Sequence, residues 1–303
     1  MIVRWGLEEL PGLLGDVGVE RPLLVASERW DALAIPAPRR WTEVPSDRIA
    51  VPPDADGILA VGGGSAIDTA KAASAASGLP LVSVPTTYSG AEWTAYFGIR
   101  TPDRRQIGGG SGARLAGIVY EPELTLELPR EATGGTALNA LAHCVEALYP
   151  GELEVARRGA AAIDGWLPRV LEDGRDVEAR TRLLEGASLA GQALAAHGLY
   201  LGHAMAQAVG GRYGIPHGAA NALCLPPAMR FNAEVVPWAT TAVPAERVEE
   251  LARLAGFERL RDLGVPKDEL GEIAKAAAER PGAKANPRPA SAEEIAELYR
   301  SVW

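Results

Sequence analysis

The sequence predicts a two-domain protein, with an α/β domain over residues 1–128 and an all-helical domain over residues 129–303. Three observations support this class. The length of 303 residues exceeds that of most single domains. Short apolar runs alternate with helical patterns in the first part, as in the βαβ units that build a parallel sheet. After Pro129 the apolar residues recur with the period of an α-helix.

Short apolar runs predict strands in the first domain, at residues 21–26, 57–61, 79–85 and 117–120. Between the second and third of these, the Ala-rich residues 70–77 predict a helix. Residues 86–90 follow the third strand, at the edge where the ligands of parallel sheets collect. The glycine-rich residues 106–112 predict a loop.

The second domain is expected to be helical throughout. Ser291, with Glu294 three residues later, predicts a capping box at the start of the last helix. The Pro-rich residues 281–289 are expected to form a connector. Helix-period apolar residues predict helices at 135–148, 155–171, 179–197, 201–210, 245–255, 258–263, 267–278 and 291–302.

The composition argues against several classes of protein. A net charge of −9 disfavours a nucleic-acid-binding protein, which normally has a basic excess. No apolar run reaches the ~18 residues that span a bilayer, and the first residues lack the pattern of a signal peptide. Cys144 and Cys224 do not form a disulfide framework. We therefore expect a cytoplasmic protein without a membrane or nucleic-acid partner.

A run of three glycines, residues 62–64, is the most informative motif. It follows the predicted strand 57–61 and precedes a helix, so backbone N–H groups and the helix dipole can bind a phosphate there. Ser65 is expected to be the N-cap, with Asp68 in the capping-box position. The spacing differs from G-x-G-x-x-G, because Ile67 replaces the third glycine, and no P-loop G-K-[ST] is present. A simple glycine turn before a helix is the alternative.

Three histidines and an asparagine suggest a second site. Asn139 and His143 are four residues apart and so lie on one face of a predicted helix, while His203 and His217 belong to later segments. Imidazoles suit Zn, Fe and Ni, but an asparagine adds no negative charge to attract a cation. Histidine clusters also occur in metal-free acid–base sites. Both a metal site and a metal-free site therefore remain open at this point.

Several segments together resemble the iron-containing alcohol dehydrogenase family. These are residues 62–71, residues 84–92 and the spacing of Asn139, His143, His203 and His217. The chain looks most similar to the maleylacetate reductase branch, which is also matched by residues 120–129, 137–149 and 286–289. In this branch, as in this chain, Asn stands where metal-dependent members carry Asp.

The resemblance implies a dehydroquinate synthase-like fold and an oxidoreductase that transfers a hydride between NAD or NADP and a small carbonyl, alcohol or activated enone. It implies His143, His203 and His217 as catalytic residues, and with Asn139 as candidate ligands of Fe or Zn. A homodimer is also implied. The implied cofactor-binding residues are Gly62, Gly63, Gly64, Ser65, Asp68, Lys71, Thr86, Thr87 and Ser89.

Two departures from the branch leave the substrate open. The reductases usually carry His-His-Lys where this chain has 202–204, and a further histidine in place of Gln207, so this chain lacks positive charge there. Around Ser27 there is no Asp that would repel the 2′-phosphate of NADP. Arg29 would favour NADP by its positive charge; the alternative is that it is an ordinary surface residue. A metal-dependent alcohol dehydrogenase and a non-catalytic nucleotide-binding protein are the alternative functions.

Overall fold

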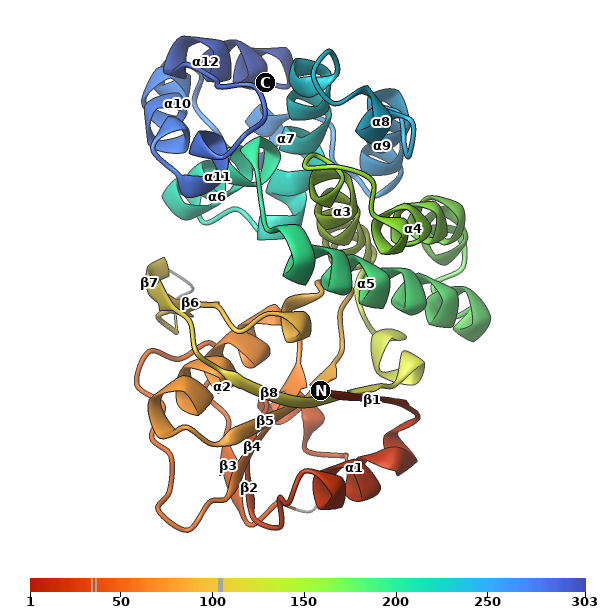
Figure 1. Ribbon diagram of the computed structural model, residues 1–303, viewed down its shortest axis with the longest axis vertical. Coiled ribbons are helices and arrows are strands. Elements are labelled where there is room, and N and C mark those ends of the chain that lie inside the picture. The colour runs from red at the N-terminus through yellow and green to blue at the C-terminus, as the bar shows by residue number, and fades with distance from the viewer. Residues whose placement is uncertain (34, 36, 103–105) are drawn as a thin grey trace. The chain divides into compact units, whose positions relative to one another are not determined.

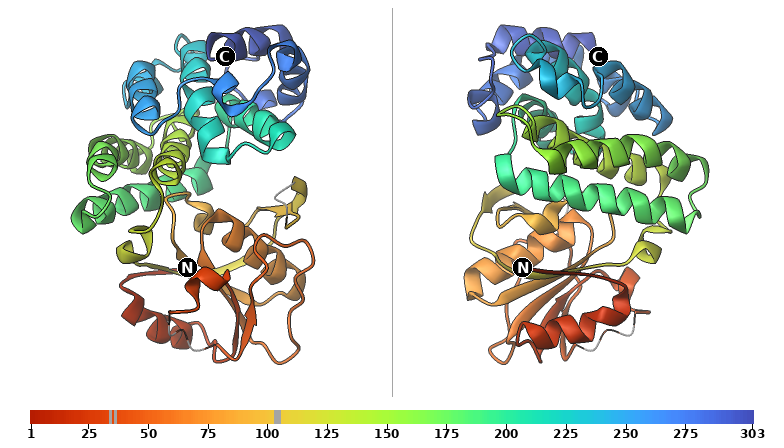
Figure 2. Two further views of the ribbon diagram at one scale, coloured as in Figure 1. Left: turned by 180° about the vertical axis from the view of Figure 1, so that it is seen from behind. Right: turned by 45° about the vertical axis from the view of Figure 1, so that its right-hand side comes forward.

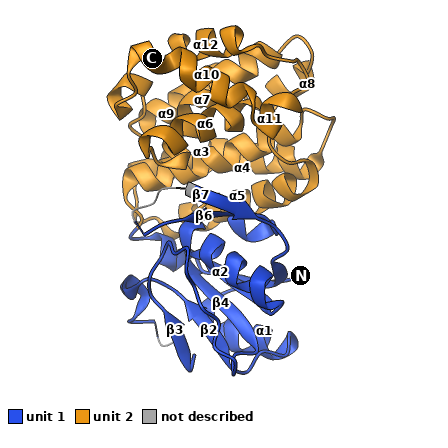
Figure 3. Ribbon diagram, turned by 90° about the vertical axis from the view of Figure 1, so that its left-hand side faces the viewer, with its two compact units in different colours: residues 1–87, 91–127 blue, residues 88–90, 128–303 orange. Residues whose placement is uncertain are grey.

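A computed structural model describes residues 1–33, 35, 37–102 and 106–303. The chain divides into two compact units (Figure 3). Unit 1 contains residues 1–87 and 91–127, and unit 2 contains residues 88–90 and 128–303. Unit 1 is an α/β structure, and unit 2 is built from helices.

Unit 1 is built on a parallel sheet that has six strands within the described residues, in the order β1-β8-β5-β4-β2-β3. The predictions of β2, β4, β5 and β8 are confirmed to within a few residues, whereas β1 and β3 were missed because they are short and partly exposed. The strands are β1 (Ile2–Trp5), β2 (Pro22–Val25), β3 (Arg39–Trp41), β4 (Gly57–Gly62), β5 (Pro80–Pro85) and β8 (Arg114–Tyr120).

Helices cover the two faces of this sheet (Figure 1). On one face, α1 (Leu10–Asp16) packs against the side chains of Leu24 and Leu59. On the other, α2 (Gly64–Ser77) packs against their neighbours in sequence, such as Ile58. This division follows from the alternation of side chains along a strand, and it explains why β4 is apolar at successive positions.

The predicted loop at residues 106–112 is wrong. Residues Gln106–Gly110 form β7, which pairs antiparallel with β6 (Phe97–Arg100). A Cβ atom at Gly109 would lie 2.8 Å from the carbonyl oxygen of Phe97, and one at Gly110 would lie 2.8 Å from its ring. Glycine composition is typical of loops, but here it permits a close approach of two strands.

Unit 2 is organised around α3 (Arg130–Ala147), whose residues from Thr133 onward are almost all buried. This helix packs against α4 (Glu154–Glu172), α5 (Val177–His197) and α7 (His217–Asn232), and α4 lies beside α5 (Figure 2). A helix that is buried on almost all sides lies at the centre of a bundle, and the polar side chains of α3 therefore need partners within the unit. The remaining helices are α6 (Leu201–Tyr213), α8 (Pro237–Thr240), α9 (Ala245–Leu254), α10 (Leu270–Ala278), α11 (Pro281–Lys284) and α12 (Ala292–Ser301).

Most of the predicted helices of unit 2 are confirmed, including the capping box of Ser291 and Glu294. Residues Leu260–Leu263 and Lys267–Glu269 are 3₁₀-helical turns instead of α-helix. The predicted connector at 281–289 contains the short helix α11. None of the helices in the described part of the chain is both long and apolar enough to cross a membrane.

Helix α7 was not expected from the sequence. This helix contains Pro226 and Pro227, which usually end a helix because they lack an N–H group. Both prolines are buried among the neighbouring helices, whose packing outweighs the weak local propensity. Its first residue is His217, directly after Pro216 at the N-cap.

The three residues 88–90 belong with unit 2, although the segments on both sides of them belong to unit 1. The hydroxyl of Tyr88 accepts a hydrogen bond of 3.1 Å from Nη1 of Arg180 on α5. A Cβ atom at Gly90 would lie 3.1 Å from the Cα atom of Gly191, also on α5. These contacts hold the segment against the helices of unit 2.

Candidate active site

The predicted phosphate-binding turn joins β4 to α2. Gly62 has φ of 148°, and a Cβ atom there would lie 2.8 Å from the Cβ of Ala66. A Cβ atom at Gly63 would lie 2.8 Å from Cγ2 of Thr87. A side chain at either glycine therefore requires a neighbour to move, so the turn presents bare backbone at the start of a helix.

The expectation that Ser65 is the N-cap of this helix is wrong. The N-cap is Gly63, which makes no side-chain cap, and Ser65 lies in the first turn. The backbone N–H of Ala66 donates to the carbonyl of Gly63 over 3.0 Å. The helix thus begins before the serine, because the glycines adopt the turn that a capping side chain would otherwise stabilise.

The end of β5 lies beside this turn. The backbone N–H of Thr86 donates to the carbonyl of Gly62 over 3.0 Å, and the side chain of Thr86 is buried. Thr87 places its methyl group against Gly63. Unit 1 therefore brings together most of the predicted cofactor-binding residues, whereas Ser89 lies in the segment that belongs to unit 2.

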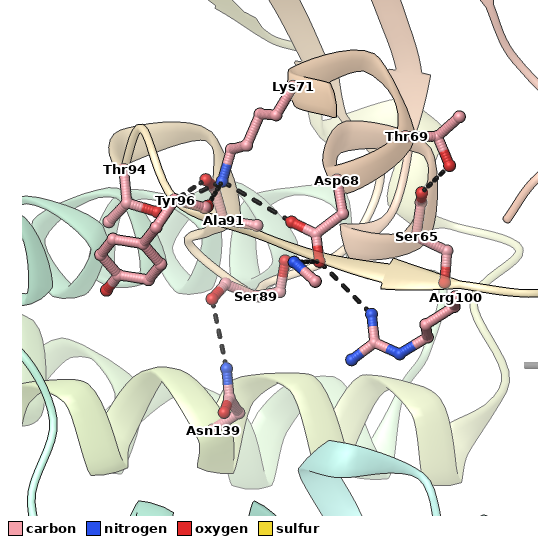
Figure 4. A network of polar contacts seen from close by, with 11 residues as sticks. Ser65, Asp68, Thr69, Lys71, Ser89, Ala91, Thr94, Tyr96, Arg100 and Asn139 are labelled. Atoms are coloured by element: carbon pink, nitrogen blue, oxygen red, sulfur yellow. Dashed lines mark hydrogen bonds and ion pairs between the residues drawn. The ribbon is translucent and has the colours of Figure 1, made fainter. Parts of the chain in front are cut away.

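Asp68 and Lys71 face the β6–β7 hairpin instead of the glycine turn (Figure 4). Nζ of the buried Lys71 donates to Oγ1 of Thr94 over 3.2 Å and to the carbonyl of Tyr96 over 3.0 Å, and it lies 3.7 Å from Asp68. Oδ2 of Asp68 accepts from Nη1 of Arg100 over 3.3 Å. Burial lowers the pKa of Lys71 and raises that of Asp68. Asp68 therefore ties α2 to β6, and Lys71 ties it to the segment just before β6.

Unit 2 brings the three predicted histidines together. His143 lies on α3, His203 on α6 and His217 at the start of α7. The rings of His143 and His203 stack with centroids 4.9 Å apart, and those of His203 and His217 are 5.6 Å apart. Burial lowers the pKa of His143 well below its usual value, and the nearby rings of His203 and His217 lower it further. This imidazole is therefore neutral.

Two asparagines connect these rings. Nδ2 of Asn139 donates to the carbonyl of Ser89 over 3.2 Å (Figure 4) and lies 3.4 Å from Nε2 of His143. Its Oδ1 accepts from Nδ2 of Asn221 over 2.7 Å, and that Nδ2 lies 3.0 Å from Nε2 of His217. Because an amide nitrogen only donates, both Nε2 atoms act as acceptors.

Sequence reasoning missed Asn221. The signal was present, since Asn221 follows His217 by four residues just as His143 follows Asn139 by four. Each Asn–His pair therefore lies on one face of its own helix, and the two faces meet between α3 and α7. The pairing was not visible because α7 itself was not predicted.

Sequence reasoning also missed Glu146, which lies one turn after His143 on α3 and has 0% of its side chain exposed. Its Oε2 accepts from Nδ1 of His203 over 2.7 Å and from the backbone N–H of Tyr200 over 2.8 Å. Its Oε1 accepts from the backbone N–H of His203 over 3.2 Å. All three hydrogen bonds that this buried carboxylate accepts come from residues at the start of α6.

A divalent metal does not fit this donor set as it is arranged. The Nε2 atoms of His143 and His217 face amide N–H groups, and the amide oxygen of Asn139 is taken by Asn221. Both carboxylate oxygens of Glu146 accept hydrogen bonds from unit 2 itself. Across the described ranges, no group of three or more His, Cys, Asp or Glu side chains is arranged to hold a metal ion. No chemical step is therefore assigned to a metal here.

A parallel sheet with a glycine turn at a helix start, together with buried imidazoles, is typical of nucleotide-dependent enzymes of the dehydrogenase type. Sequence models of one family of such enzymes match most of the chain. Residues 133–303 match the C-terminal part of the Fe-containing alcohol dehydrogenase family, and residues 48–119 match iron-containing alcohol dehydrogenase. The chain belongs to the iron-containing alcohol dehydrogenase family.

Individual relatives agree with this assignment. Maleylacetate reductase of Pseudomonas knackmussii is 33% identical over 270 residues, which is 84% of this chain and 76% of the relative. The Sphingobium indicum maleylacetate reductase is 36% identical over 81% of this chain and 73% of its own length. The crystal structure of an iron-containing alcohol dehydrogenase from Corynebacterium glutamicum matches with a TM-score of 0.87 and 28% identity, covering 100% of this chain and 94% of that one. The protein is accordingly an NAD(P)-dependent oxidoreductase.

Proposed function

We propose that the protein is an NAD(P)H-dependent reductase of small carbonyl compounds or activated enones, with maleylacetate as the first substrate to test. Two curated relatives at 33% and 36% identity are maleylacetate reductases, which supports this choice. The observation that carries the proposal is the cluster of three imidazoles, of which His143 and His203 are buried and His217 is partly exposed, with Glu146 against His203. Such a cluster can orient a substrate oxygen and exchange a proton with it.

We propose that the glycine turn of unit 1 binds the diphosphate of NAD or NADP. The tight packing at Gly62 and Gly63 supports this, because a Cβ atom at either position would lie 2.8 Å from a side-chain carbon of Ala66 or Thr87, so the turn keeps a bare backbone. Gly64 and Ser65 begin the helix whose dipole favours the phosphate charge. Thr86 and Thr87 flank the same turn. When bound, the reduced nicotinamide supplies the hydride.

Arg29 gives no preference between NAD and NADP. Arg29, which would favour the phosphate of NADP, donates to the carbonyl of Glu127 over 3.2 Å and stacks on Trp30 with 4.9 Å to the ring centroid. These contacts give it a role within unit 1 that needs no ligand. We therefore propose both cofactors as substrates for the test.

The test is oxidation of NADH and of NADPH by the full chain, followed by the loss of nicotinamide absorbance, with maleylacetate and a panel of aldehydes and ketones. We expect turnover that survives treatment with a chelator and dialysis. Loss of all activity on chelation, restored by Fe²⁺ or Zn²⁺, would favour the metal-dependent alcohol dehydrogenase. Dinucleotide binding without turnover of any substrate would favour a non-catalytic protein.

We further propose a homodimer located in the cytoplasm, which the family resemblance supports. Light scattering coupled to size-exclusion chromatography measures the mass of the particle against the 31.8 kDa of one chain. A mass of one chain at micromolar concentration would contradict the dimer.

A further inference from the structure

We propose that Glu146 is a positioning residue of the reductase, and that it holds His203 as the Nδ1–H tautomer so that Nε2 exchanges a proton with the substrate oxygen. This inference rests on the proposed function, because it assigns a role within the same cluster of imidazoles. Glu146 itself would touch no substrate atom.

The geometry between Glu146 and His203 fixes where the hydrogen lies. Oε2 of Glu146 is 2.7 Å from Nδ1 of His203, and both side chains have 0% exposure. An ionised carboxylate can only accept, so the hydrogen of this contact sits on Nδ1. In the neutral ring that places the lone pair on Nε2, on the other side of the imidazole.

Glu146 is held in this position by the start of α6. The backbone N–H groups of Tyr200, the N-cap, and of His203, the third helical residue, both donate to its carboxylate. These are N–H groups that a helix cannot satisfy internally, and the helix dipole favours a negative charge there. The carboxylate is therefore anchored by the same turn that carries the ring it orients.

Gly202 leaves the space that this arrangement needs. A Cβ atom at Gly202 would lie 3.0 Å from Oε1 of Glu146 and 3.5 Å from the Cα atom of Leu225. A larger residue would press the carboxylate away from its three donors. The combination of Gly202, His203 and Glu146 thus forms one local unit.

His203 differs from its two neighbours in what its Nε2 atom meets, although Nδ1 of His143 is likewise buried without a hydrogen-bond partner among the described residues. The Nε2 atoms of His143 and His217 face the amide groups of Asn139 and Asn221. Nε2 of His203 is buried and has no hydrogen-bond partner among the described residues. A buried polar atom without a partner is rare in folded proteins, and a ligand oxygen would satisfy it.

The proton transfer follows from this arrangement. In the reduction of a ketone, Nε2 of His203 first takes up a proton from solvent and then passes it to the carbonyl oxygen, while the carbonyl carbon would receive the hydride that NADH or NADPH supplies when bound. The products are the alcohol, the oxidised nicotinamide and neutral His203. When hydride adds to an enone, the same proton goes to the enolate oxygen. Throughout, the carboxylate of Glu146 keeps the ring in place and stabilises its positive charge before transfer.

The test compares Glu146→Gln with Glu146→Asp in the full chain. In Glu146→Gln the amide N–H group can turn toward Nδ1 and favour the opposite tautomer, so we expect kcat to fall by about 10²- to 10⁴-fold with little change in KM. Glu146→Asp keeps the charge and should recover part of the loss. Glu131→Gln, an exposed carboxylate on the same helix, is the matched control and should leave kcat unchanged.

A second readout does not depend on activity. In ¹⁵N-histidine NMR spectra, assigned with His203→Gln, the wild-type ring should show a protonated Nδ1 and an unprotonated Nε2, and Glu146→Gln should reverse this. An unreactive wild type with the expected tautomer would remove the proposed function and leave the positioning intact. A wild-type His203 with a protonated Nε2 and bare Nδ1 would overturn the inference.

If Glu146→Gln does not fold, the milder variant Gly202→Ala serves as the test. Gly202→Ala keeps the carboxylate but introduces the contact of 3.0 Å with Oε1. We expect native circular dichroism, a lower kcat and a mixed tautomer of His203. A folded Gly202→Ala or Glu146→Gln with wild-type kcat and KM would contradict the positioning role.

Discussion

Nδ2 of Asn221 donates to Oδ1 of Asn139 over 2.7 Å, which joins α7 to α3 in the middle of the imidazole cluster. Both side chains are almost fully buried. The contact explains how two helices far apart in sequence keep their histidines in register. It also places an amide hydrogen where a cation would need to approach.

Replacement of Asn221 by alanine should damage both stability and activity. The change leaves Oδ1 of Asn139 without its donor in a buried site, which costs about 1–3 kcal/mol. We expect a lower midpoint of urea unfolding together with a fall in kcat. Asn232→Ala is the matched control, because Asn232 pairs with Asn286 in a separate buried contact. It should lower stability but not kcat, and equal effects of both variants on kcat would contradict a specific role of Asn221.

Replacement of Asn139 by aspartate should create affinity for a divalent cation. The carboxylate adds a negative charge and cannot donate to Nε2 of His143, so that lone pair becomes available. Isothermal titration with ZnCl₂ should show binding at least about tenfold tighter than to wild type, or about 1.4 kcal/mol. Asn232→Asp controls for an added charge elsewhere in the unit. Unchanged Zn²⁺ affinity would show that the cluster cannot rearrange into a metal site.

Replacement of Gly63 by valine should abolish binding of the dinucleotide. The added Cβ atom would lie 2.8 Å from the methyl of Thr87 and would cover the backbone of the turn. Fluorescence titration with NADH should give a dissociation constant at least about tenfold higher, equal to about 1.4 kcal/mol. Gly15→Val is the control, since nothing lies within 4 Å of a Cβ atom there. Native affinity of Gly63→Val for both NADH and NADPH would mean that the phosphate site lies elsewhere.

Glu92 should make the stability of unit 1 depend on pH. Burial raises its pKa, although Tyr120 donates to its Oε1 over 2.7 Å, so the folded state holds a proton more tightly than the unfolded state does. The stability that this gives is present below the ordinary pKa of a glutamate and is lost as pH rises through the raised folded value.

Glu92→Gln removes this dependence, because the amide stays neutral at every pH. Urea unfolding between about pH 4 and pH 8 should therefore show the variant gaining on wild type as pH increases. Parallel curves for the two proteins would exclude an abnormal titration of Glu92. For Glu131→Gln, at an exposed position, the stability against urea should change with pH in the same way as for wild type.

The sequence was sufficient to predict the class of fold, because the central strands β4 and β5 are apolar and the helices of unit 2 are periodic. It failed where tertiary contacts override local preference. The prolines within α7 weaken its helical propensity, so that no helix was predicted there, and the glycines of β7 suggested a loop. In both cases close packing decides the structure, and a single sequence does not display packing.

The same limit applies to the site. The three histidines were predicted because imidazole is rare in this chain, with four in all. Glu146 was missed because Glu is common and nothing local marks it, and Asn221 was missed because α7 itself was not predicted. Their roles depend on which atom meets which across two helices, and that becomes visible only once α3, α6 and α7 are brought together.

The short excursion of residues 88–90 means that neither unit is a continuous piece of chain. A fragment that begins at residue 128 would lack the Ser89 carbonyl to which Nδ2 of Asn139 donates. The amide could then rotate, and Nε2 of His143 would lose the hydrogen that it accepts. Recombination of this helical half with a foreign nucleotide-binding half must therefore keep these three residues within the foreign sequence.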